Sequence, residues 1–101
     1  MGRFTEIYNR TKSLGMLQEE GSIPTSLIKL GEEVGELNEA YLRSIGYKKG
    51  KESDANQDLK EECVDTLIMI LDIANKLDIT KKELYTLLDI KLDKWESKYC
   101  K

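Results

Sequence analysis

Apolar residues recur at intervals of three and four along most of the chain, and this spacing predicts α-helices rather than β-strands. The only proline, Pro24, lies in a turn-rich stretch, so little else interrupts the pattern. Four helices are predicted, over residues 3–17, 25–45 and 54–77 and from about residue 80 onward. Thr25 or Ser26 is expected to cap the second helix, and Thr80 with Glu83 has the spacing of a capping box before the fourth.

The helix predicted at 54–77 has apolar residues around most of its circumference. They include Val64, Leu67, Ile68, Ile70, Leu71 and Ala74. Such a helix is expected at the centre of a fold, yet one chain offers few helices to surround it. The glycine- and lysine-rich stretch 46–53 is predicted to be the loop before this helix. The sequence therefore predicts one all-α domain over residues 1–101, similar to a four-helix bundle with an antiparallel central hairpin, that assembles as a homodimer or tetramer.

Charge and length exclude several classes of function. The chain has 16 basic and 19 acidic residues among 101, a net charge of −3, and no basic stripe that would follow a nucleic-acid backbone. No apolar run approaches the ~18 residues that cross a bilayer, and the first residues lack a secretory hydrophobic region. We therefore expect a cytoplasmic protein that binds neither nucleic-acid polymers nor membranes. Cys63 and Cys100 define no disulfide framework, and Cys63 is expected to be a reduced core residue.

Two acidic clusters lie on the two helices of the predicted hairpin. The first is Glu32-Glu33-x-x-Glu36, the second is Glu62-x-x-Asp65, and 25 residues separate Glu36 from Glu62. Residues three apart lie on neighbouring turns of one helix face, so each helix can offer a pair of carboxylates to a common point. Carboxylates that meet in space repel one another, and a divalent cation removes that repulsion. The clusters therefore predict a Mg2+ site, with Mn2+ as an alternative ion, suited to chemistry on phosphates.

The position of these acids on the central helix favours the same interpretation. Glu62, Asp65 and Asp72 project to one narrow sector of an otherwise apolar helix, so some of them should face protein. A buried carboxylate needs a cation, a lysine or a bound proton to offset its charge, and a metal ion is the simplest of the three. On the second helix, Lys29 lies one turn before Glu33 and could meet a phosphate.

The motif E-E-x-x-E, followed after a spacer by E-x-x-D, resembles the signature of the all-α nucleoside triphosphate pyrophosphohydrolases, specifically the short MazG-like proteins. The resemblance covers about residues 27–77, and the basic and aromatic ending around Trp95 is similar to that of the same group. It implies a Mg2+-dependent enzyme that cleaves an NTP or dNTP between the α and β phosphates, giving a nucleoside monophosphate and pyrophosphate.

Carried over to this chain, the resemblance makes Glu33, Glu36, Glu62 and Asp65 the metal ligands. It gives Glu32 the role of orienting or deprotonating the attacking water. Four lysines are candidates for binding the phosphate chain of the substrate: Lys29, Lys91, Lys94 and Lys98. The family often has arginine at the last of these positions, and lysine keeps the charge but loses bidentate phosphate geometry.

Two other functions stay open. Phosphoribosyl-ATP pyrophosphohydrolase has a similar helical fold and acidic motif, but it usually carries a histidine after that motif, and this chain has no histidine. The other is a non-catalytic helical interaction module whose acids only bind a cation or solvate a bundle. In such a module Glu33→Gln and Asp65→Asn would be neutral or stabilising, and no triphosphate would be cleaved.

Overall fold

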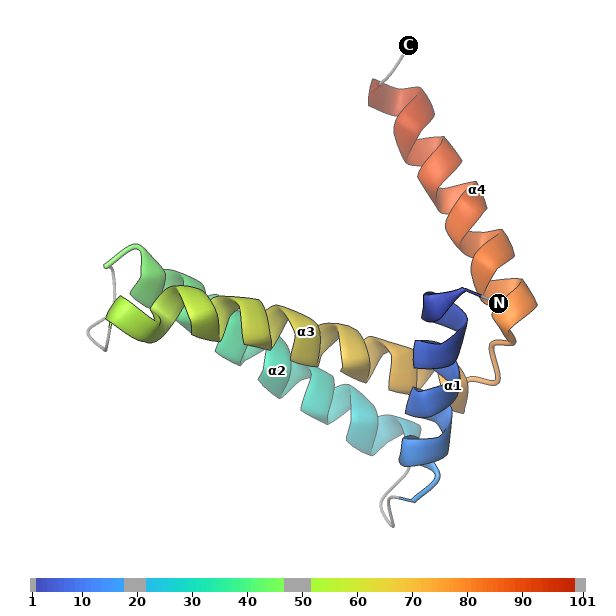
Figure 1. Ribbon diagram of the computed structural model, residues 1–101, viewed down its shortest axis with the longest axis horizontal. Coiled ribbons are helices and arrows are strands. Elements are labelled where there is room, and N and C mark those ends of the chain that lie inside the picture. Colours follow the sequence, from blue (N-terminus) through green and yellow to red (C-terminus); the bar gives the residue numbers. More distant parts are fainter. Residues whose placement is uncertain (1, 18–21, 47–51, 100–101) are drawn as a thin grey trace.

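The computed structural model describes residues 2–17, 22–46 and 52–99. These residues form four α-helices: α1 (Arg3–Gly15), α2 (Ile23–Ser44), α3 (Glu52–Lys76) and α4 (Lys81–Tyr99). The described residues contain no β-strand, which confirms the predicted all-α class. Helices α2 and α3 lie side by side and antiparallel, as the predicted hairpin requires (Figure 1).

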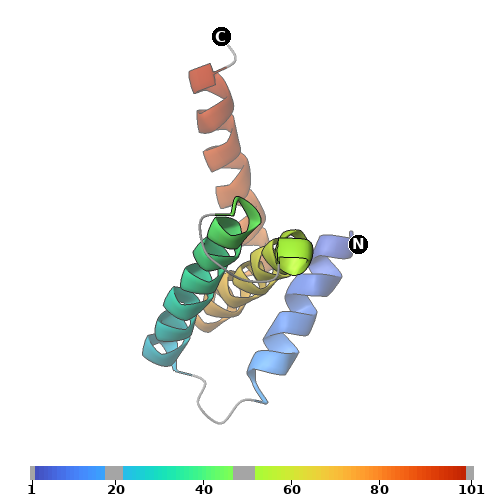
Figure 2. The ribbon, with the colours of Figure 1, turned by 90° about the vertical axis from the view of Figure 1, so that its left-hand side faces the viewer.

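Helix α1 crosses the carboxyl-terminal part of α3 (Figures 1 and 2). Its Tyr8 is buried with Leu71 and Ala74 of α3 in a small apolar core. Asn75 of α3 donates a hydrogen bond of 2.9 Å from Nδ2 to Oγ1 of Thr11, a buried residue of α1. Apolar packing and buried polar contacts therefore both hold α1 against α3.

Helix α2 begins earlier than its sequence pattern predicts. Ser22 is its N-cap, and its Oγ accepts a hydrogen bond of 3.2 Å from the backbone N–H of Thr25. The predicted caps are wrong, because Thr25 and Ser26 lie inside the helix. Pro24 lies in its first turn. Proline is tolerated there, since the first backbone N–H groups of a helix have no partner within it.

Two other predicted ends also shift by about two residues. Helix α1 ends at Gly15 rather than at residue 17, and α3 begins at Glu52 rather than at residue 54. Most of the predicted loop at 46–53 lies outside the described residues, but Gly46, with a φ of 76°, ends the turn that follows α2.

Within the described part of the chain, the contacts of helix α4 with other helices lie near its start. The predicted capping box is confirmed, since the N–H of Glu83 donates to Oγ1 of Thr80 at 3.1 Å and the N–H of Thr80 donates to Oε1 of Glu83 at 3.3 Å. Tyr85 shares a hydrogen bond with Thr5 of α1 and has its ring 6.0 Å from that of Phe4. Beyond these turns α4 points away from the hairpin, and none of its residues is buried (Figure 1).

The predicted central position of α3 is reached only in part within a single chain. Leu71 and Ala74 are buried where α1 crosses, whereas Val64 and Leu67 are about half exposed. Cys63 is also exposed, so its expected place in the core is wrong. It lies on a turn of α3 that α1 does not reach, and α2 packs against another side of that turn.

Asp72 is buried where α1, α2 and α3 meet. The ammonium group of Lys76 donates to Oδ2 of Asp72 and to Oγ of Ser26, both at 2.7 Å. A Cβ at Gly15 would lie 2.5 Å from Oδ1 of Asp72, so glycine lets the end of α1 approach the carboxylate. A lysine therefore offsets the charge of Asp72, where a metal ion was expected to do so.

Candidate metal centre

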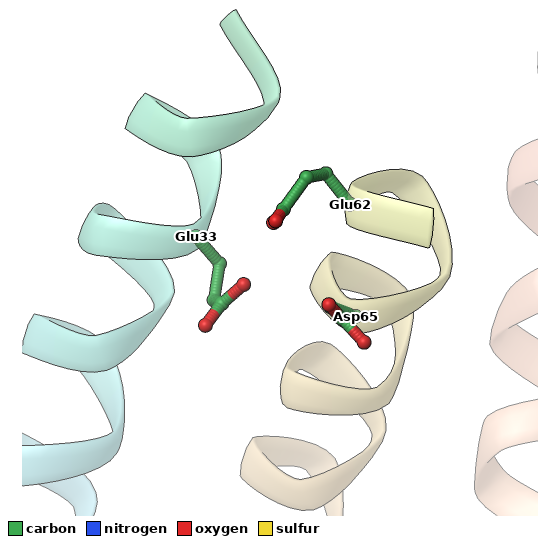
Figure 3. A group of neighbouring side chains, drawn as sticks. All are labelled: Glu33, Glu62 and Asp65. Carbon is green, nitrogen blue, oxygen red and sulfur yellow. The ribbon is translucent and has the colours of Figure 1, made fainter. Parts of the chain in front are cut away.

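Glu33 of α2 meets Glu62 and Asp65 of α3 across the hairpin (Figure 3). One carboxylate oxygen from each of the three residues lies within 4.8 Å of the other two. Glu62 and Asp65 are three positions apart and so lie on neighbouring turns of α3. The cluster is therefore built from two packed helices, and no loop is needed to position its side chains.

The carboxylates of this cluster are buried to different degrees. Glu33 and Glu62 are half-buried, while Asp65 is exposed. Oε2 of Glu33 and Oε2 of Glu62 are buried, and no donor among the described residues lies within hydrogen-bonding distance of either atom. A buried carboxylate oxygen without a donor is costly. A cation bound between the helices would satisfy both oxygens.

The surroundings of Glu62 raise its pKa from 4.5 to about 7. Burial is the largest cause, and the negative charge of Glu36 is the next. A hydrogen bond that the protonated carboxyl group can donate to Glu33, and the charges of Glu33 and Asp65, raise it further. Near neutral pH the cluster therefore holds a proton in many molecules, and a divalent cation would have to displace that proton.

The three carboxylates fit a small, hard cation. Oxygen ligands lie about 2.1 Å from Mg2+, so ligands on opposite sides of the ion are about 4.2 Å apart. A spread of up to 4.8 Å between the oxygens requires only small side-chain shifts to reach this geometry. The ligand set contains oxygen alone, which suits Mg2+ or Mn2+ better than softer metals. The exposed position of Asp65 leaves one side of the cluster open to solvent.

The other predicted site residues lie outside the group of three carboxylates. The charge of Glu36 acts on Glu62, but its oxygens are not among the three that lie within 4.8 Å of one another. Glu32 and Lys29 are exposed on α2. The remaining candidates are exposed on α4, which points away from the hairpin (Figure 1): Lys91, Lys94 and Lys98. The structure thus brings three predicted ligands together and keeps the fourth nearby. Within one chain, it does not bring the lysines of α4 to them.

An ion pair that was not predicted from the sequence joins the two helices beside the cluster. Nη1 of Arg43, near the end of α2, lies 3.1 Å from Oδ2 of Asp58 on α3. Asp58 is one turn before Glu62, so the pair holds α2 and α3 together next to the turns that carry the acids. In the sequence, this ion pair is indicated only by the opposite charges of Arg43 and Asp58 on either side of the predicted loop.

No family model, curated protein or solved structure matches this chain. Among residues 2–17, 22–46 and 52–99, no helix has both the length and the apolar character needed to span a membrane. The function is therefore inferred from the acidic cluster and from the motif that produces it.

Proposed function

We propose that this protein is a Mg2+-dependent nucleoside triphosphate pyrophosphohydrolase of the MazG-like, all-α class, acting in the cytoplasm as a homo-oligomer. It would cleave an NTP or dNTP between the α and β phosphates and release a nucleoside monophosphate and pyrophosphate. The proposal rests on the cluster of Glu33, Glu62 and Asp65, whose oxygens lie within 4.8 Å of one another across two antiparallel helices. The order E-E-x-x-E and E-x-x-D supports it, because it resembles the signature of that class.

The charges of the cluster favour phosphate chemistry through a cation. A triphosphate and a group of carboxylates repel each other, so they can share a site only with a cation between them. When bound, Mg2+ neutralises phosphate oxygens and lowers the pKa of a coordinated water. Glu33, Glu62 and Asp65, with Glu36 beside them, would hold the ion, and Mn2+ could take its place. Lys29, exposed one turn before Glu33, is suited to bind a phosphate oxygen.

Glu32 is the candidate base of the reaction. It is exposed and directly precedes Glu33. In the proposed step the oxygen of a water forms a bond to phosphorus, and the bond from that phosphorus to the oxygen bridging the α and β phosphates breaks. The proton of the water passes to Glu32 or to solvent, and Glu32 also orients the water.

Product analysis tests the proposal directly. The purified protein is incubated with Mg2+ and a panel of NTPs, dNTPs and phosphoribosyl-ATP, and monophosphate plus pyrophosphate is separated from diphosphate plus phosphate. We expect monophosphate and pyrophosphate, and we expect a chelator or Glu33→Gln to abolish both. Glu61→Gln is the matched control, because Glu61 is an exposed acid next to Glu62 that lies outside the cluster.

The other results would replace the proposal. Turnover of phosphoribosyl-ATP alone would assign the chain to the pyrophosphohydrolase of histidine synthesis. No turnover of any nucleotide by a folded protein that binds Mg2+ would favour the non-catalytic interaction module. Activity that survives Glu33→Gln combined with Asp65→Asn would exclude the cluster as the site.

A further inference from the structure

A cavity of about 460 Å3 lies where α1 and α3 end, outside the carboxylate cluster (Figure 1). The absence of a side chain at Gly15 keeps one of its walls open, because a Cβ there would lie 2.5 Å from Oδ1 of Asp72. The lining of the cavity includes Lys12, Gly15, Met16, Asp72, Lys76 and Asp78.

The cavity lies along α3 from the carboxylate cluster. Asp72 follows Asp65 by seven positions, which places it about 10.5 Å further along the helix and only about 20° around it. Between the two, Ile68 is 46% exposed and offers an apolar surface. This separation is comparable with the span from the α phosphorus of an extended nucleotide to the far edge of its base. A nucleotide whose α phosphate is held at the cluster can therefore reach the cavity with its base.

The charges at the cavity decide which part of a nucleotide it suits. Lys12 and Lys76 balance Asp72 and Asp78, so these four lining side chains carry no net charge together. Helices α1 and α3 both end at the cavity, and the carboxyl end of a helix carries a partial negative charge. Phosphates are disfavoured in such surroundings, whereas an uncharged base with hydrogen-bonding groups is accepted.

One wall of the cavity offers an acceptor and a donor side by side. Oδ2 of Asp72 accepts hydrogen bonds from Lys76 at 2.7 Å and from Ser26 at 3.3 Å, whereas Oδ1 accepts none among the described residues. The ammonium group of Lys76 uses two of its three N–H donors, on Asp72 and Ser26. The free acceptor and the free donor together match a base edge that carries an N–H beside an acceptor atom.

We propose that this cavity binds the base of the nucleotide substrate and that guanine is the base it fits best. O6 of guanine would accept from Lys76, and the adjacent N1–H and 2-amino group would donate to Oδ1 of Asp72. Lysine is a common partner of guanine O6. Adenine and cytosine place a ring nitrogen beside their amino donor, and uracil and thymine have a single N–H donor for the carboxylate. The inference rests on the proposed function and adds base selection to it.

Binding of free nucleosides tests the cavity without any turnover. Guanosine is titrated in chelator into protein labelled with carbon-13 at its methionine methyl groups, and the signal of Met16 is followed, because Met16 lines the cavity. We expect guanosine to shift this signal. It should bind at least about tenfold more tightly than 1-methylguanosine, which lacks the N1–H donor. Adenosine, cytidine and uridine should also bind more weakly than guanosine.

Two matched variants locate the bound base. Met16 and Leu17 are almost equally exposed, at 78% and 79%, but only Met16 is among the residues that line the cavity. Met16→Ala should weaken guanosine binding at least about threefold through lost apolar contact, whereas Leu17→Ala should leave it unchanged. Asp72→Asn should remove the preference for guanosine over 1-methylguanosine. If Asp72→Asn does not fold, as judged by far-ultraviolet circular dichroism, the comparison of ligands and the pair at positions 16 and 17 still decide.

The outcomes separate this inference from the proposed function. Equal binding of guanosine and 1-methylguanosine would overturn the inference, as would equal effects at positions 16 and 17 or tighter binding of another nucleoside. Cleavage of triphosphates by a protein whose Met16 signal does not respond to guanosine would overturn the inference alone. Guanosine bound at the cavity of a protein that cleaves no triphosphate would support the base site and overturn the proposed function.

Discussion

Replacing Glu62 by glutamine is expected to remove a specific dependence of stability on pH. In the folded protein the pKa of Glu62 is raised from 4.5 to about 7. The folded state therefore binds this proton more tightly than the unfolded state does. The resulting stabilisation is complete below about pH 4.5 and is lost as the pH rises through 7. Glutamine cannot ionise, so the Glu62→Gln protein should lack this loss.

The expected magnitude follows from the protonated fraction of Glu62. With a pKa of about 7, roughly nine-tenths of the folded molecules hold the proton at pH 6, half at pH 7 and one-tenth at pH 8. A bound cation has to displace it, so Mg2+ binding at pH 7 should release about half a proton from this group. Well below pH 7, the apparent Mg2+ dissociation constant of the wild type should rise by up to about tenfold for each pH unit.

Thermal unfolding measured with chelator from about pH 5 to about pH 8 gives the first readout. The wild-type Tm should fall relative to that of Glu62→Gln as the pH rises, and Mg2+ should raise the wild-type Tm more than that of the variant. Calorimetry in two buffers of different protonation enthalpy then counts the released proton. Glu61→Gln, one position away and exposed, should follow the wild type. A Tm difference between wild type and Glu62→Gln that does not change with pH would refute the reasoning.

Two further predictions concern the junction around Asp72, and urea denaturation measures both. Gly15→Ala should lower the free energy of unfolding by about 1–3 kcal/mol, because its Cβ would lie 2.5 Å from Oδ1 of Asp72. Gly35→Ala is the control, because a Cβ there meets nothing within 4 Å, and it should raise the free energy of unfolding by up to about 1 kcal/mol. If Gly15→Ala and Gly35→Ala changed the free energy of unfolding in the same way, the packing of α1 on α3 would be contradicted. Lys76→Met should cost about 3 kcal/mol, because it leaves the buried carboxylate of Asp72 without its cation. Adding Asp72→Asn to Lys76→Met should restore part of the lost stability. If the effects of the two substitutions on the free energy of unfolding were fully additive, Lys76 and Asp72 would not interact.

The helices could be predicted from the sequence because their apolar spacing is local, but their ends could not. Thr25 and Ser26 were reasonable caps by residue type, yet Ser22 is equally suited and stands before the proline that the first turn accepts. The capping box at Thr80 and Glu83 was predictable because two residues at fixed spacing specify it together. A single capping side chain is a weaker signal than a reciprocal pair.

The acidic cluster was predictable in part. Its spacing puts Glu33 and Glu62 on facing helices, but the rotation of α2 against α3 decides which acids meet, and this rotation depends on the packing of the whole hairpin. Asp72 shares a sector of α3 with Glu62, yet the two have different partners, because Lys76 lies one turn after Asp72 and no lysine lies one turn after Glu62. The direction of α4 could not be predicted, because the apolar spacing of α4 does not determine it. It depends on contacts with other helices, such as those of Tyr85 with Thr5 and Phe4 of α1.

The acids that interrupt the apolar surface of α3 are offset in two different ways. Lys76 lies 2.7 Å from Oδ2 of Asp72, so this buried carboxylate has its cation within the same helix. Oε2 of Glu33 and Oε2 of Glu62 are buried without a hydrogen-bond partner among the described residues, and the pKa of Glu62 is raised to about 7. A cation that binds these carboxylates in the folded protein, and binds the unfolded chain less well, would therefore stabilise the hairpin by mass action. The junction at Asp72 needs no such ion, so removal of Mg2+ should lower the stability of the wild type through the Glu33–Glu62 cluster and not through Asp72.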